Sequence, residues 1–133
     1  MGKQQVMLLV VEDDLAMRSL LCDELWDLGA RIIEAGDGDE ALERISESVP
    51  DLIVTDLRMP AGGLDYVARL RTLAPACPII LMTAFGDAKT REQAKQYGVA
   101  AYFDKPVRMQ DLKAAIKNLL LNHNANGSTG PHA

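Results

Sequence analysis

Short apolar segments alternate along the chain with longer segments of helix length, and this alternation restricts the possible folds more than any other feature. Three of the five apolar segments are almost entirely hydrophobic, as expected for strands buried on both faces of a parallel sheet. The predicted strands are 6–11, 31–35, 51–55, 78–83 and 100–104. The predicted helices are about 15–28, 38–47, 64–73, 87–97 and 108–121.

Strict alternation with short connections predicts an α/β fold, in which right-handed crossovers place helices on both faces of a parallel sheet. Asp14 is expected to cap the first helix, and Gly29 and Gly98 follow the first and fourth helices, where a left-handed residue is favoured. The predicted apolar face of the first helix consists of Met17, Leu20, Leu21, Leu25 and Leu28. We therefore expect a small doubly wound domain of five strands and five helices, with its ligand site beyond the carboxyl ends of the strands.

Composition narrows the class of protein. The chain has 133 residues, enough for one hydrophobic core, and its 48% hydrophobic and 25% charged residues are typical of a globular domain. The net charge is -5, with acids and bases mixed, so there is no basic stripe and we expect no direct contact with nucleic acid. Residues 122–133 are small and polar without periodicity, which predicts a disordered tail or a truncated linker.

The sequence carries neither a targeting signal nor a disulfide pattern. The N-terminal apolar run is too short for a signal peptide, and no segment reaches the length of a transmembrane helix. Cys22 and Cys77 are far apart and fit neither a C-x-x-C motif nor a metal spacing, so we expect reduced thiols. The sequence therefore predicts a cytoplasmic protein without a membrane partner.

Polar residues stand where the predicted strands end, and the carboxyl ends of parallel strands meet at one edge of a sheet. They are Glu12 and Asp13, Asp56, Thr83, and Lys105 followed by Pro106. Three clustered carboxylates repel one another, so they need a hard divalent cation such as Mg²⁺. With that charge and Lys105 present, Asp56 can act as a nucleophile on a phosphoryl group, and the Thr83 hydroxyl can donate to its oxygens.

Each of these residues also has an ordinary structural explanation. A single acid after a strand is more often a turn residue or a helix cap than a ligand. Taken alone, Thr83 is most simply interpreted as a strand-end residue, and Lys105 as a surface charge. The combination at four strand ends is what favours a phosphoryl site.

The motifs at these strand ends resemble those of the receiver domain of two-component response regulators. VVEDD at 10–14, TDLRMP at 55–60, MTA at 82–84 and YFDKP at 102–106 match that family in order and spacing, and the resemblance covers roughly residues 5–121. It implies a flavodoxin-like fold with the strand order 2-1-3-4-5. It also implies a phosphorylation-activated signalling domain.

By that resemblance Asp56 is the phosphoacceptor, which takes its phosphoryl group from a histidine of a sensor histidine kinase or a histidine phosphotransfer protein. Glu12, Asp13 and Asp56 would hold Mg²⁺, or Mn²⁺ in its place, together with the backbone carbonyl of Arg58. The chemistry expected is self-phosphotransfer and autodephosphorylation, so the domain would not be a true enzyme.

The resemblance also assigns the residues that sense the phosphoryl group. Lys105 would contact it, next to a cis bond to Pro106. Thr83 and Tyr102 match the family's switch pair, in which the threonine moves towards the phosphoryl group and the tyrosine turns inward into the vacated space. Phosphorylation adds about −1.5 to −2 charge and new acceptor oxygens, towards which Thr83 would move.

The expected output face consists of the fourth helix, the fifth strand and the fifth helix, which would serve an effector or self-association. The fourth helix has few apolar anchors beyond Ala88, Ala94 and Tyr97, and weak packing suits an element that must shift. A charged surface helix without a signalling role is the alternative interpretation.

One segment departs from the family pattern. The family usually has Met-Pro-x-Met-Asp-Gly-Leu after the phosphoacceptor strand, whereas Met-Pro-Ala-Gly-Gly-Leu at 59–64 is one residue shorter and lacks the acid. We therefore expect the shape of this loop, and any partner that reads it, to differ.

We weigh three alternatives to a phosphorylation-activated receiver. A Mg²⁺-dependent phosphatase with an aspartyl nucleophile would carry a second Asp two residues later, where this chain has Arg58. A flavodoxin-like FMN binder would need a Ser/Thr/Gly phosphate loop at 12–14, where acids would repel the phosphate. The third alternative is a receiver that no longer accepts phosphate and serves as a constitutive interaction domain.

Overall fold

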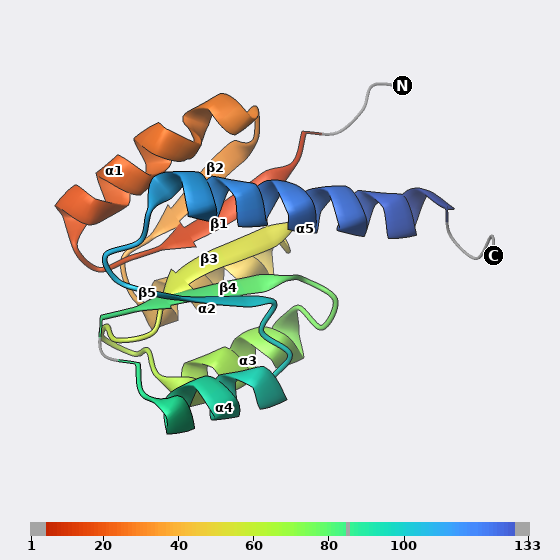
Figure 1. The fold of residues 1–133 in the computed structure, drawn as a ribbon. Helices are drawn as coiled ribbons and strands as arrows, with labels where there is room; N and C mark the ends of the chain where they lie inside the picture. Colours follow the sequence, from red (N-terminus) through yellow and green to blue (C-terminus); the bar gives the residue numbers. More distant parts are fainter. Residues whose placement is uncertain (1–4, 85, 130–133) are drawn as a thin grey trace.

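Five parallel strands form one sheet in the order β2-β1-β3-β4-β5, as predicted (Figure 1). The computed structural model describes residues 5–84 and 86–129, with side chains described as far as residue 122. The strands are β1 (Met7–Val11), β2 (Arg31–Ala35), β3 (Leu52–Asp56), β4 (Ile79–Thr83) and β5 (Ala101–Asp104). Each strand begins and ends within one residue of its predicted range.

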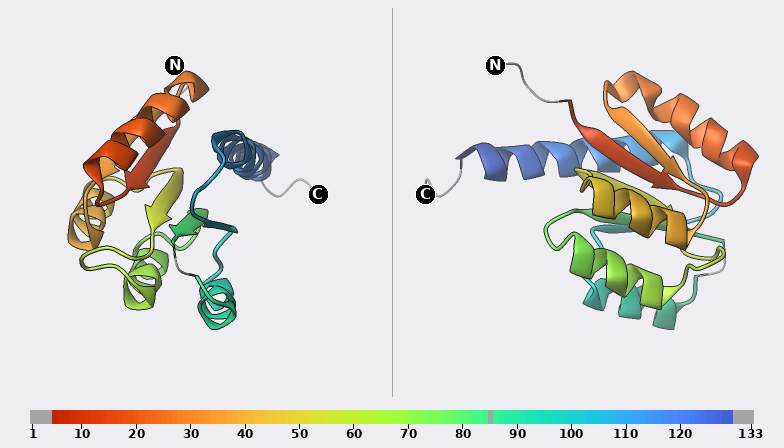
Figure 2. Two further views of the ribbon diagram at one scale, coloured as in Figure 1. Left: turned by 60° about the vertical axis from the view of Figure 1, so that its left-hand side comes forward. Right: turned by 180° about the vertical axis from the view of Figure 1, so that it is seen from behind.

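Helices cover both faces of this sheet (Figures 1 and 2). Their bounds are α1 (Leu15–Leu25), a short 3₁₀ helix η1 (Trp26–Leu28), α2 (Gly38–Glu47), α3 (Leu64–Leu73), α4 (Ala88–Gln96) and α5 (Met109–Thr129). Side chains of α1 and α5 form one apolar core with the sheet, and those of α2, α3 and α4 form the other. The fold is therefore the predicted doubly wound, flavodoxin-like α/β architecture.

The strand that ends in Asp56 lies in the middle of the sheet and is buried along its whole length. Side chains alternate between its faces, so Val54 packs with the α1 and α5 core while Ile53 packs with the other. Strand β1 lies on one side of β3 and β4 on the other. The residues that follow these strands therefore emerge from the core side by side.

Local signals fix most helix ends. The Asp14 carboxylate accepts the Met17 N–H at 3.0 Å, and Gly29 and Gly98 have φ angles of 77° and 73°. All three residues act as predicted.

The predicted burial of two apolar residues is wrong. Leu20 is 48% exposed, and Ala88 at the start of α4 is also exposed. The face of α1 that packs on the sheet consists of the buried Leu21 and Leu25 and the partly buried Met17. Leu20 directly precedes Leu21, and neighbouring residues in a helix point about 100° apart.

The last helix continues beyond its predicted end at residue 121, because α5 runs to Thr129. The predicted boundary at residue 122 thus falls within the helix. Side chains from residue 123 onwards lie outside the described residues, and the assignment of 122–133 to a tail stays a prediction. No helix in the described part of the chain is long and apolar enough to cross a membrane.

The loop between β3 and α3 is compact and rests against α2. Its turn is closed by the Gly63 N–H, which donates to the Leu57 carbonyl at 2.8 Å, and Ala61 adopts a left-handed φ of 58°. Gly38, the first residue of α2, donates its N–H to the Pro60 carbonyl at 3.0 Å. A Cβ at Gly38 would overlap the Ala61 carbonyl oxygen, so this contact requires glycine.

The Arg71 guanidinium ties the C-terminal ends of α3 and α4 together. It donates to five backbone carbonyl oxygens, at distances of 2.9–3.2 Å, in the turn before β4 and at the end of α4: Ala74, Pro75, Cys77, Tyr97 and Gly98. One end of α4 is therefore anchored by hydrogen bonds to a charged group, which are stronger than those between neutral groups.

Replacing Gly38 by Ala should lower the free energy of unfolding by about 2 kcal/mol, because the added methyl group overpacks the contact with Ala61. Urea denaturation measures this change. Gly29→Ala serves as a control with open space around the added Cβ, although its left-handed φ costs about 1 kcal/mol. A Gly38→Ala protein as stable as the wild type would contradict the tight contact.

Replacing Arg71 by Met should lower the free energy of unfolding by about 2–3 kcal/mol, because several carbonyl groups lose a charged donor. The matched control is Arg69→Met on the same helix, where an exposed side chain should change stability by less than about 0.5 kcal/mol. Equal effects of the two substitutions in urea denaturation would show that the hydrogen bonds of Arg71 contribute nothing.

Candidate functional site

The strand order brings the predicted acidic residues into one cluster. Carboxylate oxygens of Glu12, Asp13 and Asp56 lie within 4.8 Å of one another. Lys105, just after β5, reaches across the end of β4 and donates from Nζ to Glu12 Oε1 at 2.7 Å and to Asp56 Oδ2 at 2.9 Å. Residues from three distant parts of the chain thus meet at the carboxyl edge of the sheet.

Two of these carboxylates are almost completely buried. Glu12 is 1% exposed and Asp56 is 4% exposed, whereas Asp13 is exposed to solvent. Burying a charge is costly unless it is paired and hydrogen-bonded, and both acids meet this condition. Besides the Lys105 ammonium, Glu12 Oε2 accepts the Asp14 N–H at 3.1 Å, and Asp56 Oδ1 accepts the Arg58 N–H at 3.2 Å.

Charge in the cluster is not balanced. Burial raises the pKa of the Glu12 carboxyl group, although the hydrogen bond from Lys105 acts in the opposite direction. Burial alone would lower the pKa of Lys105, but its hydrogen bonds to Glu12 and Asp56 outweigh this and raise it, so the ammonium stays charged. When all three carboxylates are ionised, one ammonium leaves two negative charges, which a single divalent cation would neutralise.

Thr83, at the end of β4, is 0% exposed, and its Oγ1 has no hydrogen-bond partner among the described residues. Its backbone carbonyl accepts the Lys105 N–H at 2.8 Å, so the two residues are held next to each other. A buried hydroxyl group without a partner costs free energy. Thr83 therefore offers a donor at the edge of the acidic cluster that an anion would satisfy.

The remaining predicted residues lie nearby. The peptide bond between Lys105 and Pro106 is cis. Tyr102 is partly buried, and its hydroxyl oxygen also lacks a partner within the described part of the chain. Arg58 lies beside Asp56 through its backbone N–H, while the role of its carbonyl group stays a prediction.

Sequence reasoning missed two supports of the cluster. Arg18 donates to the Glu12 carbonyl at 2.8 Å and pairs with Glu34 at 3.0 Å. Thr55 shares a buried hydrogen bond of 2.9 Å with the Tyr66 hydroxyl group, directly before the phosphoacceptor candidate. No local pattern in the sequence pairs these residues, because each contact joins side chains from different elements.

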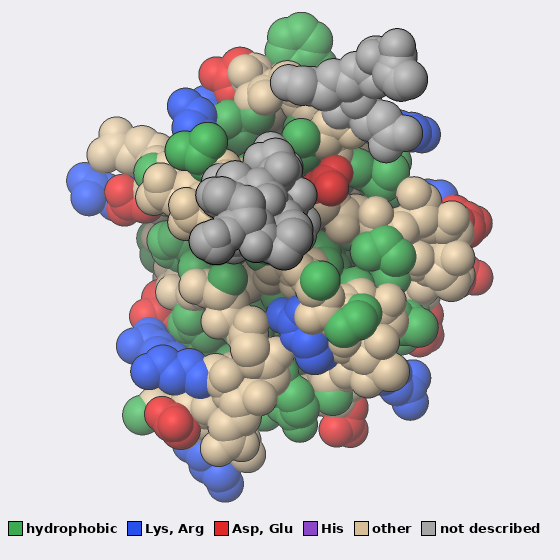
Figure 3. All heavy atoms as spheres, turned by 90° about the vertical axis from the view of Figure 1, so that its right-hand side faces the viewer, with side chains coloured by type: hydrophobic (Ala, Val, Ile, Leu, Met, Phe, Trp, Pro, Cys, Tyr) green, Lys and Arg blue, Asp and Glu red, His purple; other side chains and the backbone are tan. Residues whose placement is uncertain are grey.

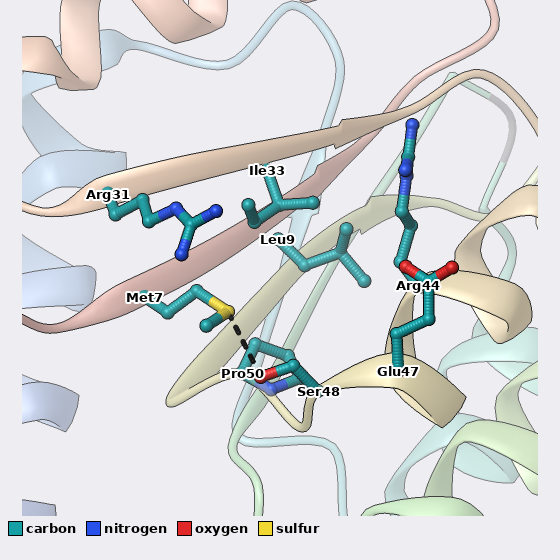
Figure 4. Close-up of a pocket in the computed structure, with 8 residues that line it drawn as sticks. All are labelled: Met7, Leu9, Arg31, Ile33, Arg44, Glu47, Ser48 and Pro50. Carbon is teal, nitrogen blue, oxygen red and sulfur yellow. Dashed lines mark hydrogen bonds between the residues drawn. The ribbon is translucent and has the colours of Figure 1, made fainter.

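A hollow of about 170 Å³ lies between β1, β2 and the end of α2 (Figure 4). Its lining consists of Met7, Leu9, Arg31, Ile33, Arg44, Glu47, Ser48 and Pro50. Met7 and Arg31 begin their strands, so this hollow lies away from the carboxyl edge and contains none of the predicted site residues.

On the opposite side of the molecule from the carboxyl edge, charged side chains of both signs are scattered among hydrophobic ones (Figure 3).

The family model of the response regulator receiver domain, compared with this sequence, matches residues 8–117. Among curated relatives, the transcriptional regulatory protein ZraR of Klebsiella oxytoca is 32% identical over 90% of this chain, and the phosphate regulon transcriptional regulatory protein PhoB of Escherichia coli is 32% identical over 85%. The chain spans 27% and 51% of the length of these two relatives. The sporulation initiation phosphotransferase F of Bacillus subtilis is 27% identical over 85% of this chain and 92% of its own length.

Solved structures of receiver domains superpose on this chain. A response regulator receiver domain from Clostridium thermocellum is 27% identical and superposes with a TM-score of 0.83 over 90% of this chain and 98% of its own. A receiver domain from Methanospirillum hungatei shares the fold, with a TM-score of 0.88 over 92% of this chain and 99% of its own at 23% identity. The family model, the strand order and the acidic cluster agree, and the chain belongs to the response regulator receiver domain family.

Proposed function

We propose that Asp56 accepts a phosphoryl group from a phosphohistidine of a sensor histidine kinase or a histidine phosphotransfer protein, in a reaction that depends on Mg²⁺. The observation that carries this proposal is the contact of Lys105 with both Glu12 and Asp56, which leaves the acidic cluster short of two positive charges. Family membership makes the domain a signalling module of two-component systems, and the site explains how this chain would perform that role.

The ligand atoms of the cluster suit a hard cation. Carboxylate and carbonyl oxygens are the donors that Mg²⁺ prefers, and Mn²⁺ accepts the same set. Glu12, Asp13, Asp56 and the backbone carbonyl of Arg58 would hold the ion. When bound, it supplies positive charge beside the reacting oxygens.

The transfer itself needs little from the protein beyond positioning and charge. A carboxylate oxygen of Asp56 forms a bond to phosphorus as the bond between phosphorus and the donor histidine nitrogen breaks. Lys105, which contacts Asp56 Oδ2 in this structure, then moves its hydrogen bond to a phosphoryl oxygen. The Thr83 hydroxyl group gains the acceptor that it lacks here.

Loss of the phosphoryl group returns the domain to its resting state. Water attacks phosphorus, the bond to Asp56 breaks, and inorganic phosphate leaves. This autodephosphorylation and the self-phosphotransfer are the reactions that we assign to the domain. A phosphatase acting on other substrates is disfavoured, because Arg58 stands where such an enzyme would place its second acid.

We assign the output to the surface formed by α4, β5 and α5, where an effector or a second copy of the domain would bind. Two relatives are transcriptional regulators, of which this chain spans only a part, and one is a phosphotransferase of nearly the same length. A cytoplasmic location fits a partner that carries phosphohistidine. Contact with nucleic acid would then belong to an effector rather than to this domain.

Incubation with Mg²⁺ and acetyl phosphate should add the mass of one phosphoryl group to the intact protein, and Asp56→Asn should abolish the addition. Mass spectrometry under acidic quench measures the adduct. Omission of Mg²⁺ should lower its yield by at least about 100-fold, because the cluster then keeps its negative charge. Beryllium fluoride binding, followed in parallel, detects a working site even if hydrolysis is fast. A folded protein that gives neither signal would refute the proposal.

Replacing Lys105 by Met should separate metal binding from phosphoryl transfer. Mg²⁺ should bind severalfold more tightly, because the carboxylates lose the ammonium that competes for them. The rate of phosphorylation should fall about 100-fold, because a donor to the phosphoryl group is lost. Calorimetric titration and the mass assay measure the two effects.

The matched control is Lys113→Met, because Lys113 forms its ion pair with Asp27, which is neither a site residue nor a contact of one. Both the Mg²⁺ affinity and the phosphorylation rate of this variant should equal those of the wild type. Weaker Mg²⁺ binding in Lys105→Met would mean that the lysine supports the metal site instead of competing with it.

A further inference from the structure

The Tyr102 hydroxyl group is packed inside the molecule against Gly86. A Cβ placed on Gly86 would overlap the Tyr102 hydroxyl oxygen and would lie 2.8 Å from Thr83 Cγ2. The glycine thus leaves the space that the tip of the tyrosine ring occupies beside Thr83. With any larger residue at position 86, the ring could not stay in this position.

Arg91 covers the same ring from helix α4. Its guanidinium carbon lies 4.9 Å from the ring centroid, a distance at which a cation is attracted to the face of an aromatic ring. Arg91 also pairs with Asp104 at 2.9 Å, but both side chains are half exposed, so this ion pair contributes little. Unlike the ion pair, the contact with the ring involves a partly buried partner, Tyr102.

Helix α4 has few other attachments at this end. Of its residues, all of which the structure describes, Ala94 alone is buried. Hydrogen bonds from Arg71 hold the C-terminal end of the helix through Tyr97 and Gly98. The first half of α4 is held to β5 through Arg91, so the position of the Tyr102 ring and the position of this half of the helix depend on each other.

We infer that Gly86 and Arg91 are positioning residues that hold the Tyr102 ring inward and thereby link helix α4 to the phosphoryl site. Gly86 makes the inward position possible, and Arg91 favours it. The inward ring fills the space behind Thr83 and keeps the threonine hydroxyl group at the acidic edge. This inference rests on the proposed function, because it concerns how the same site is coupled to its output face.

The inward ring and the phosphoryl group favour each other, so a variant that lowers the population of the inward ring lowers the apparent affinity for the phosphoryl group by the same fraction. Gly86→Ala should exclude the ring and weaken the Mg²⁺-dependent binding of beryllium fluoride, a mimic of the phosphoryl group, about tenfold. Arg91→Gln should weaken it about two- to fivefold, as expected for loss of one partly exposed contact between a cation and a ring. The affinity for Mg²⁺ alone should not change in either variant.

NMR spectra of protein labelled on the tyrosine rings provide a second readout, before any ligand is added. The Tyr102 signals, assigned with Tyr102→Phe, should shift in Gly86→Ala and in Arg91→Gln. A merely structural role would lower thermal stability and all affinities together, and would leave the ring signals of the folded protein in place.

Three controls isolate the contact. Lys89→Gln removes a positive charge from the same helix without touching the ring, and Asp104→Asn breaks the ion pair of Arg91 but keeps the ring contact. Both should change beryllium fluoride affinity less than twofold. In a Tyr102→Ala background, where the ring is absent, Gly86→Ala should lose most of its effect and keep only the part that comes from its close contact with Thr83 Cγ2.

The outcomes separate the two proposals. If the wild type binds no beryllium fluoride through Asp56, the proposed function fails. If the wild type binds it and both Gly86→Ala and Arg91→Gln bind it equally well, with unshifted ring signals, the inference is overturned while the proposed function stands.

Discussion

The ammonium group of Lys105, shared between Glu12 and Asp56, is the interaction on which the site depends. It joins the ends of three strands and pairs with both of the almost completely buried carboxylates. Because it balances only part of the negative charge, the same contact leaves the edge ready for a divalent cation and a phosphoryl group. Lys105 thus stabilises the buried carboxylates, and it also competes with a metal ion for the same oxygen atoms.

Buried hydroxyl groups differ in whether they have a hydrogen-bond partner. Thr55 and Tyr66 satisfy each other within the core, whereas the hydroxyl groups of Thr83 and Tyr102 have no partner in the described part of the chain. Those two residues stand on the neighbouring strands β4 and β5, and Arg91 of helix α4 lies over the Tyr102 ring. An arriving phosphoryl group would satisfy the first, and the weakly attached helix beside the second would respond.

Much of the fold could be predicted because it depends on local patterns. Apolar runs of strand length, a capping aspartate at Asp14 and glycines at the helix ends report the geometry of their own segments. The errors arose where a pattern was ambiguous. Leu20 satisfies the helical spacing but points away from the sheet, and Ala88 is exposed at the first turn of its helix. The end of α5 was also misplaced, because polar residues that favour coil can still continue a helix.

The sequence by itself determined which residues stand at the strand ends, and with the parallel order this was enough to place Asp56, Glu12 and Lys105 together. Tertiary structure alone decided the contacts between side chains of different elements. Arg18 beneath Glu12, Arg71 across two helix ends, and Arg91 over Tyr102 follow no spacing along the chain. The physical reason is that a long arginine side chain can reach many neighbours, and only the packed positions of helices and strands select one.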